Sequence, residues 1–195
     1  MRRTLWILGT LALVAVLVVG VLQAGSGDEP GDGPAPAFDL DAALQRLDGA
    51  PPPIAQLHGE ANTVVASSRS DFERRLKALK GYPVVVNAWA SWCGPCKLEF
   101  PIFQRVSTSM GKQVAFLGLN TQDNTDNAKA YLAKTPVPYP SLEDGDSRIL
   151  QEAGGVGGLP TTIFYDKRGE RAMVHQGGYE TERDLVEAIR RYAGA

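Results

Sequence analysis

Two cysteines, Cys93 and Cys96, lie three positions apart, and the 195-residue chain has no others. If a helix begins here, the two thiols lie about one turn apart and can close into a disulfide and open again. Cys93 would occupy the helix N-terminus, where free backbone N–H groups and the helix dipole stabilise a thiolate. Cys96 would lie further inside. This asymmetry predicts that Cys93 attacks a substrate disulfide and that Cys96 resolves the mixed disulfide, with no metal or organic cofactor.

Two other roles for the cysteine pair are weaker. A structural zinc site needs four ligands, and only His58 and His175 could supplement the pair; neither has ligand spacing. A static structural disulfide would close a loop so short that it constrains little of the unfolded chain. We therefore expect a redox pair rather than a metal site or a purely structural bridge.

The elements that position the cysteines can be predicted from the flanking residues. Pro83 to Trp89 is an apolar run typical of a strand that is buried on both faces. This strand would deliver Cys93 to one edge of a sheet. The helix that follows should kink at Pro101 and continue to about Met110.

The residues around the pair resemble a known family. The run Trp92–Lys97, read Trp-Cys-Gly-Pro-Cys-Lys, follows the apolar run 83–90 and resembles the active-site strand and helix of the thioredoxin superfamily. The extension 97–101, Lys-Leu-Glu-Phe-Pro, resembles the membrane-tethered TlpA/ResA/CcmG branch, and the resemblance extends from about Tyr82 to the C-terminus. It implies a thioredoxin-like α/β fold, a mixed central sheet flanked by helices with a TlpA-type αβ insertion, and thiol:disulfide oxidoreductase activity.

The resemblance also implies a substrate site. In this superfamily the proline that corresponds to Pro160 follows a cis peptide bond and lies against the disulfide. The backbone of the preceding residue, here Leu159, can pair with an extended substrate strand. The expected substrate-binding residues are therefore Leu159 and Pro160, together with three residues beside the cysteines: Trp92, Gly94 and Pro95.

Glu99 is the expected third catalytic residue. Asn87 occupies the position at which cytosolic thioredoxins carry a buried acid that helps to deprotonate the resolving cysteine, so no charge is available there. Glu99 lies three residues after Cys96 on the same helical face and could take that proton instead, as the family resemblance also implies. The alternative is an exposed helix glutamate beside Lys97.

The N-terminus carries a targeting or anchoring element. Arg2 and Arg3 precede an uncharged, almost wholly apolar run from Leu5 to Leu22. That length suits a transmembrane helix, which needs roughly 17–25 residues, better than a secretory signal core of roughly 7–15. We expect a single-pass anchor in the lipid bilayer, with cleavage of a signal as the alternative. The arginines would stay inside, so the rest faces a compartment outside the cytoplasm that favours disulfides.

The predicted organisation has five segments. They are a cytoplasmic n-region 1–4, the anchor 5–22, a Gly- and Pro-rich linker 23–36, an N-terminal extension 37–62 and a thioredoxin-like domain 63–195. In the extension we expect a helix at 38–47 that stops before the prolines at 51–53, with His58 in a loop. The net charge of −2 and the lack of a basic stripe exclude nucleic acid as an expected partner.

The remaining elements of the domain follow from capping, periodicity and turn residues. A capping box of Ser70 and Glu73 should begin a helix that ends at Gly81, and the last helix should be amphipathic. The other expected elements are strands at 63–66, 113–119, 162–166 and 171–176 and helices at 127–134, 147–153 and 181–192.

The direction of electron flow can also be predicted. Gly94 and Pro95 between the cysteines match thioredoxin, whose reduction potential is roughly −270 mV against roughly −120 mV for the oxidant DsbA. We therefore expect a protein that reduces disulfide-bearing proteins outside the cytoplasm, apocytochrome c among them by family analogy, and is recharged by a membrane electron donor. The alternatives are an oxidase of secreted protein thiols and a redox-silent docking module. A peroxidase would carry a threonine where Ala90 stands.

Overall fold

The computed structural model of this chain describes residues 37–156 and 158–195. The expected n-region, anchor and linker at 1–36 lie outside these residues. Across 37–156 and 158–195, none of the helices combines the length and the apolar character needed to cross a membrane.

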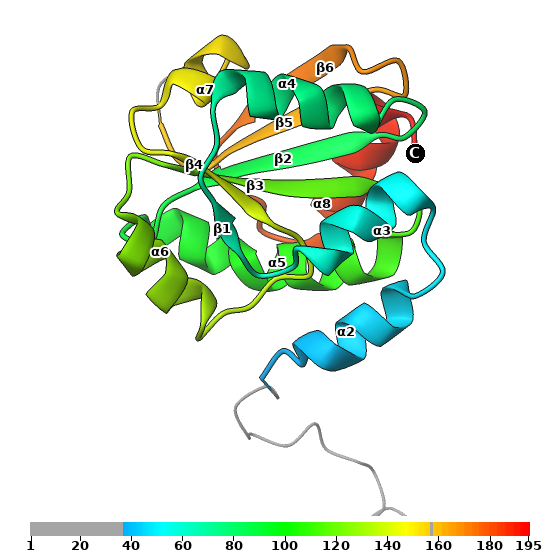
Figure 1. Cartoon of the computed structure of the whole chain (residues 1–195), viewed down its shortest axis with the longest axis horizontal. Helices are drawn as coiled ribbons and strands as arrows, with labels where there is room; N and C mark the ends of the chain where they lie inside the picture. Colours follow the sequence, from blue (N-terminus) through cyan, green and yellow to red (C-terminus); the bar gives the residue numbers. More distant parts are fainter. Residues whose placement is uncertain (1–36, 157) are drawn as a thin grey trace, which may run out of the picture. The chain divides into compact units, whose positions relative to one another are not determined.

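The core of the fold is a six-stranded mixed sheet with the strand order β1-β4-β3-β2-β5-β6 (Figure 1). Strands β1, β4, β3 and β2 run parallel to one another, whereas β5 is antiparallel to β2 and β6 is antiparallel to β5. The strands are β1 (Val64–Val65), β2 (Val84–Trp89), β3 (Ala115–Thr121), β4 (Ser141–Asp144), β5 (Thr161–Tyr165) and β6 (Arg171–Gln176). This confirms the expected thioredoxin-like α/β architecture of a mixed sheet flanked by helices.

Helices cover both faces of the sheet. The side chains of Val85 and Trp89 point to one face, which α5, α6 and α8 cover, while those of Val84, Val86 and Ala88 point to the face covered by α3, α4 and α7. Every residue of β2 is therefore buried, as predicted for a strand covered on both sides. The helices are α2 (Leu40–Leu47), α3 (Pro52–Gly59), α4 (Arg69–Ala78), α5 (Gly94–Met110), α6 (Thr125–Leu132), α7 (Arg148–Glu152) and α8 (Glu182–Ala188).

The β2–α5 unit confirms the predicted positions of the strand and helix that flank the cysteines. Cys93 is the N-cap of α5, and the helix continues past Pro101 to Met110. Trp89 at the end of β2 packs edge-to-face on Phe100 of α5, with ring centroids 5.0 Å apart. This aromatic contact belongs to the same buried cluster as Cys93 and Cys96 and fixes α5 against the sheet.

The predicted helix at 38–47 is confirmed as α2, but the next segment differs from the prediction. The prolines at 51–53 begin a helix, α3, rather than only ending the previous one. Proline suits the first helical turn because its missing N–H would have no helical partner there. His58 consequently lies near the end of α3 and not in a loop.

The predicted capping box at Ser70 and Glu73 is wrong by two residues. The N-cap of α4 is Ser68, which has an extended backbone, and Asp71 completes the box. The backbone N–H of Ser68 donates to Asp71 Oδ2 over 2.9 Å. Ser70 instead lies inside the first turn, where its hydroxyl is 2.9 Å from that of Ser68.

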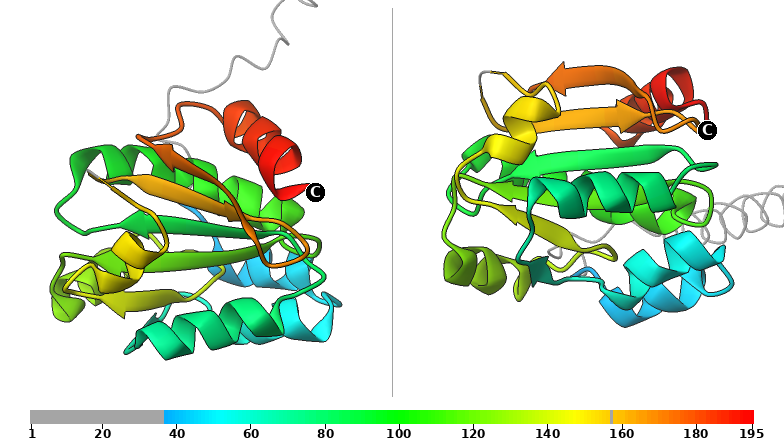
Figure 2. Two further views of the ribbon diagram at one scale, coloured as in Figure 1. Left: turned by 90° about the horizontal axis from the view of Figure 1, so that it is seen from above. Right: turned by 45° about the horizontal axis from the view of Figure 1, so that its top comes forward.

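The segment after β3 contains the extra helix and strand that the sequence indicates. Helix α6 and strand β4 lie between β3 and α7 in the chain, and β4 pairs with β3 on one side and β1 on the other. At the C-terminus α8 continues into a π-helical turn, Ile189–Ala193, where a single helix to Tyr192 was expected. Figure 2 shows this C-terminal helical segment beside β5 and β6.

Candidate functional site

The two cysteines form a disulfide at the N-terminus of α5. The S–S distance is 1.98 Å, and the backbone N–H of Cys96 donates to Cys93 Sγ over 3.2 Å. Cys96 is fully buried, and Cys93 is 3 % exposed. The sulfur of Cys93 thus lies at the start of a 17-residue helix, where the Cys96 N–H and the helix dipole favour a thiolate once the disulfide opens.

The surface beside the disulfide is formed by Trp92, Gly94 and Pro95. All three residues are exposed, and 59 % of Trp92 is accessible, which is unusual for so large an apolar side chain. The Trp92 indole N–H donates to the Gln122 carbonyl oxygen over 2.8 Å, so the loop after β3 holds the ring in place. The same loop supplies Asp123, whose Oδ1 accepts a hydrogen bond from the Ser91 hydroxyl over 2.9 Å.

Leu159 and Pro160 lie beside this surface, immediately before β5. The peptide bond between them is cis, and the Pro160 carbonyl oxygen accepts a hydrogen bond from the Gly177 N–H over 2.9 Å. A Cβ atom placed on Gly178 would lie 3.5 Å from Pro160 Cγ, 3.5 Å from Glu99 Oε2 and 3.8 Å from the Pro95 carbonyl oxygen. Pro160 and Gly178 therefore lie close to Glu99 and to the start of α5, although they come from a distant part of the chain.

A cavity of about 580 Å³ opens next to Trp92. Apolar side chains contribute much of its wall, among them Leu150, Leu159 and Val156, which is 74 % exposed. The polar contributions come from Gln122 and Ser147, among others. Two of the expected substrate-binding residues, Trp92 and Leu159, line this cavity.

Glu99 is buried and not an exposed helix residue. Its Oε1 accepts a hydrogen bond from Asn87 Nδ2 over 2.9 Å, and its Oε2 accepts one from the Tyr179 backbone N–H over 3.2 Å. Burial raises the pKa of Glu99 to about 7, although both hydrogen bonds oppose the rise. A carboxyl group that titrates near neutral pH, one helical turn from Cys96, can take up and return the proton of that thiol.

Sequence reasoning did not anticipate the two residues that hold Glu99. Asn87 alternates with Val85 and Trp89 along β2, so its side chain lies on the face that α5 covers, and this alternation could have indicated the contact. Tyr179 donates through its backbone N–H from 80 residues away, and no side-chain pattern signals such a donor.

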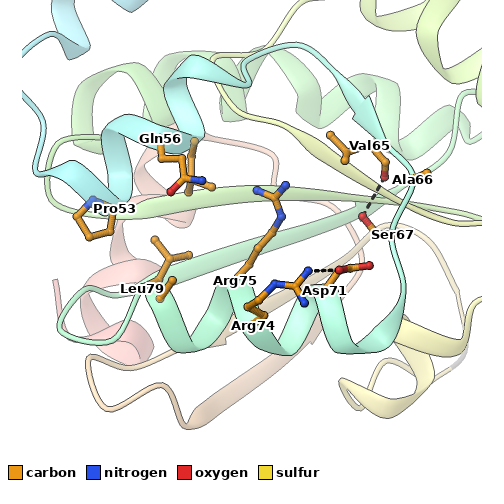
Figure 3. A pocket seen from close by; sticks show the side chains of 11 residues that line it. Pro53, Gln56, Val65, Ala66, Ser67, Asp71, Arg74, Arg75 and Leu79 are labelled. Atoms are coloured by element: carbon orange, nitrogen blue, oxygen red, sulfur yellow. Dashed lines mark hydrogen bonds and ion pairs between the residues drawn. The ribbon is translucent and has the colours of Figure 1, made fainter.

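A second cavity lies away from the disulfide, between α3, β1 and α4 (Figure 3). Arg75 projects into it and pairs with Glu60 over 2.7 Å, while Arg74 pairs with Asp71. These arginines are thus neutralised by neighbouring carboxylates. None of the sequence-predicted site residues lines this cavity, and we assign it no part in the redox site.

Comparison with known proteins gives the family. The model of the Redoxin family matches residues 60–191. The chain belongs to the Redoxin family. It is 32 % identical over 174 residues to the thiol:disulfide interchange protein DsbE of Tatumella citrea, an alignment that covers 88 % of this chain and 85 % of that protein.

Another relative is the thiol-disulfide oxidoreductase ResA of Geobacillus thermodenitrificans, 33 % identical over 114 residues, or 58 % of this chain and 65 % of the relative. Against DsbE of Pseudomonas fluorescens biotype C the identity is 35 %, and the alignment covers 47 % of this chain and 49 % of the relative. For these two relatives the alignment thus spans 65 % and 49 % of their own length. The names confirm the resemblance to the TlpA/ResA/CcmG branch.

Solved structures agree with the fold. A DsbF homologue from Corynebacterium diphtheriae matches with a TM-score of 0.55 and 32 % identity over 60 % of this chain and 75 % of that one. The dsbF of M. tuberculosis, in mixed oxidized and reduced forms, matches with a TM-score of 0.54 and 28 % identity. The match covers 59 % of this chain and 84 % of that one. Both support the thioredoxin-like assignment.

Proposed function

We propose that this protein is an extracytoplasmic thiol:disulfide oxidoreductase that reduces disulfides in other proteins, with Cys93 as nucleophile, Cys96 as resolving thiol and Glu99 as its base. The observation that carries this proposal is the position of the Cys93–Cys96 disulfide at the N-terminus of α5, with a buried carboxyl group one turn further along. The names of the relatives support the same chemistry.

The reaction starts from the reduced pair. The Cys93 thiolate, stabilised by the Cys96 N–H, attacks one sulfur of the substrate disulfide, and the other substrate sulfur leaves as a thiolate that takes a proton from water. Glu99 then accepts the proton of the Cys96 thiol. The Cys96 thiolate attacks Cys93 Sγ, and the second substrate sulfur leaves as a thiolate. Glu99 then gives up the proton it accepted, so that the released sulfur ends as a thiol and Glu99 is ionised again. Two electrons have passed to the substrate, and the enzyme retains the Cys93–Cys96 disulfide.

The substrate segment would lie along Trp92 and the Leu159–Pro160 turn. Leu159 comes before β5, and its backbone takes no part in the pairing of β5 with β2 or with β6. An extended chain can therefore pair with it in the manner of an added strand. Gly94 and Pro95, which lack bulky side chains, would let that chain approach the disulfide closely.

The location and the electron donor belong to the same proposal. The apolar run 5–22 would anchor the chain in the membrane with the domain 63–195 outside the cytoplasm. A dithiol carrier in the membrane would reduce the Cys93–Cys96 disulfide after each turnover. The Gly-Pro pair between the cysteines favours the reducing direction. By family resemblance, apocytochrome c cysteines are candidate substrates.

Trapping of intermediates tests this function. In a Cys96→Ser variant the mixed disulfide on Cys93 cannot be resolved, so disulfide-bearing proteins should accumulate as adducts that dithiothreitol releases. A Cys93→Ser variant is the matched control and should form few adducts. If both variants remain free of adducts, the chain is a docking module and not an oxidoreductase.

A further inference from the structure

Asn87 and Thr162 stand side by side on the sheet beneath Glu99. In the antiparallel pairing of β2 with β5, Asn87 lies opposite Thr162, so both side chains project from the same face. It is the face covered by α5 and α8, because Val85 and Trp89, two residues to either side of Asn87, pack in the same cluster as the residues of α5. Side chains at such positions have Cβ atoms only about 4.5–5.5 Å apart.

Each of these two residues has one buried polar atom that finds no partner within the part of the chain that the structure describes. The atoms are Asn87 Oδ1 and Thr162 Oγ1. Both residues are at most 1 % exposed. An amide oxygen only accepts hydrogen bonds, whereas a hydroxyl both donates and accepts, so a single water can donate to Oδ1 and accept from the threonine.

We propose that Thr162 is a positioning residue for Glu99. Through one buried water its hydroxyl holds the Oδ1 end of Asn87, and the Nδ2 end of the same amide is thereby kept directed at Glu99 Oε1, 2.9 Å away. The inference rests on the role of Glu99 in the proposed function.

The chemical consequence follows from the two orientations of an amide. With Nδ2 toward Glu99, Asn87 donates to a carboxylate. Rotated by half a turn, Asn87 would present Oδ1, which is compatible only with a protonated carboxyl group. In the first orientation the Thr162 hydroxyl donates to the water and the water donates to Oδ1. In the rotated amide the hydroxyl would have to accept from the water, which would leave its own buried proton without an acceptor. Thr162 therefore favours the first orientation and with it the ionised form of Glu99, and only this form can accept the proton of Cys96.

Among residues 37–156 and 158–195, few other titratable groups lie around Glu99. They are Cys96 on α5, Tyr139 before β4 and Tyr179 after β6, with the ring of His175 stacked on Tyr179 at 4.5 Å. Burial raises the pKa of both tyrosines, so they stay neutral while Glu99 titrates. In the oxidised protein the cysteines do not titrate. His175 lies opposite Thr162 on β6, and its own ring signals allow its titration to be followed separately.

The test is an NMR titration of the Glu99 carboxyl carbon in the oxidised protein. A Thr162→Val variant keeps the branched shape but loses the hydroxyl, and the midpoint should rise by about 0.5–1 pH unit because Asn87 is released. Thr162→Ser restores the hydroxyl and should return the midpoint to the wild-type value. As a matched control, Thr121→Val removes a buried hydroxyl that bonds to Ser147 and should leave the Glu99 midpoint unchanged.

An unchanged midpoint in Thr162→Val, or an equal rise in Thr162→Ser, overturns the proposal. A high-resolution crystal structure of the wild-type protein is a second measurement that needs no variant to fold. It should show a water between Asn87 Oδ1 and Thr162 Oγ1, and a dry contact there overturns the proposal too. Because the titration uses oxidised protein, a shifted midpoint together with failed trapping on Cys93 would reject the proposed function while the positioning role stands.

Discussion

At the scale of single residues, Glu99 links the chemistry of the site to the stability of the fold. Its carboxyl group is fully buried between α5 and β2, with one donor on each oxygen and no cationic partner among them. Desolvation therefore outweighs the hydrogen bonds and raises its pKa from 4.5 to about 7. The same burial that prepares Glu99 to exchange a proton near neutral pH makes its charged form costly.

Replacing Glu99 with glutamine should remove a pH dependence of stability. Between about pH 4.5 and pH 7 the folded protein binds the Glu99 proton more tightly than the unfolded chain does. The contribution of Glu99 to the free energy of unfolding therefore falls as pH rises through that window. Relative to Glu99→Gln, the oxidised wild-type protein should lose about 3 kcal/mol of unfolding free energy between pH 4 and pH 8. Urea denaturation across this range measures the difference, and parallel curves for the two proteins would show that Glu99 is not desolvated.

At the scale of elements, the β2–α5 unit could be predicted because its signals are local. An apolar strand, a cysteine turn and a helix with an internal proline follow one another directly in sequence. The start of α4 could not be chosen so easily, since Ser68 and Ser70 both precede an acid by three residues. Only the extended backbone at Ser68 decides between them. The proline run at 51–53 is similarly ambiguous, because proline both ends helices and begins them.

The corrected start of α4 makes a prediction for two serines. Ser68→Ala removes the side-chain acceptor for the Asp71 N–H and should lower the unfolding free energy by about 1 kcal/mol. Ser70→Ala changes a residue inside the first turn and should have an effect within about 0.5 kcal/mol. Urea denaturation of both variants compares them. A larger loss for Ser70→Ala would place the N-cap where the sequence first indicated it.

At the scale of the whole molecule, the site exists only because distant segments meet at one sheet edge. The cysteines and Glu99 belong to one short stretch, and sequence reasoning identified them. The Tyr179 N–H and the Asn87 amide come to Glu99 from two other elements, and only the folded sheet brings them there. The family resemblance predicts Pro160 as a site residue. Its position near Glu99, with Gly178 next to both, depends on the tertiary structure.

The reduction potential of the whole domain decides the direction of electron flow. A reductant with a Gly-Pro pair should have a potential nearer to thioredoxin, roughly −270 mV, than to DsbA, roughly −120 mV. Equilibration with glutathione and thioredoxin couples of known potential gives the value, and the Cys96→Ser variant should show no intramolecular two-electron transition. A potential near that of DsbA would make the chain an oxidase of secreted thiols.

The acidity of Cys93 is the quantity on which the account depends most directly. The hydrogen bond from the Cys96 N–H and the N-terminus of α5 should stabilise its thiolate, so the pKa should lie well below the value of about 8.5 for free cysteine. The measurement is the rate of alkylation by iodoacetamide against pH in the reduced protein, with mass spectrometry to assign the modified residue. We predict a midpoint at least one pH unit below that of free cysteine at Cys93. A midpoint at the value of free cysteine would contradict the account.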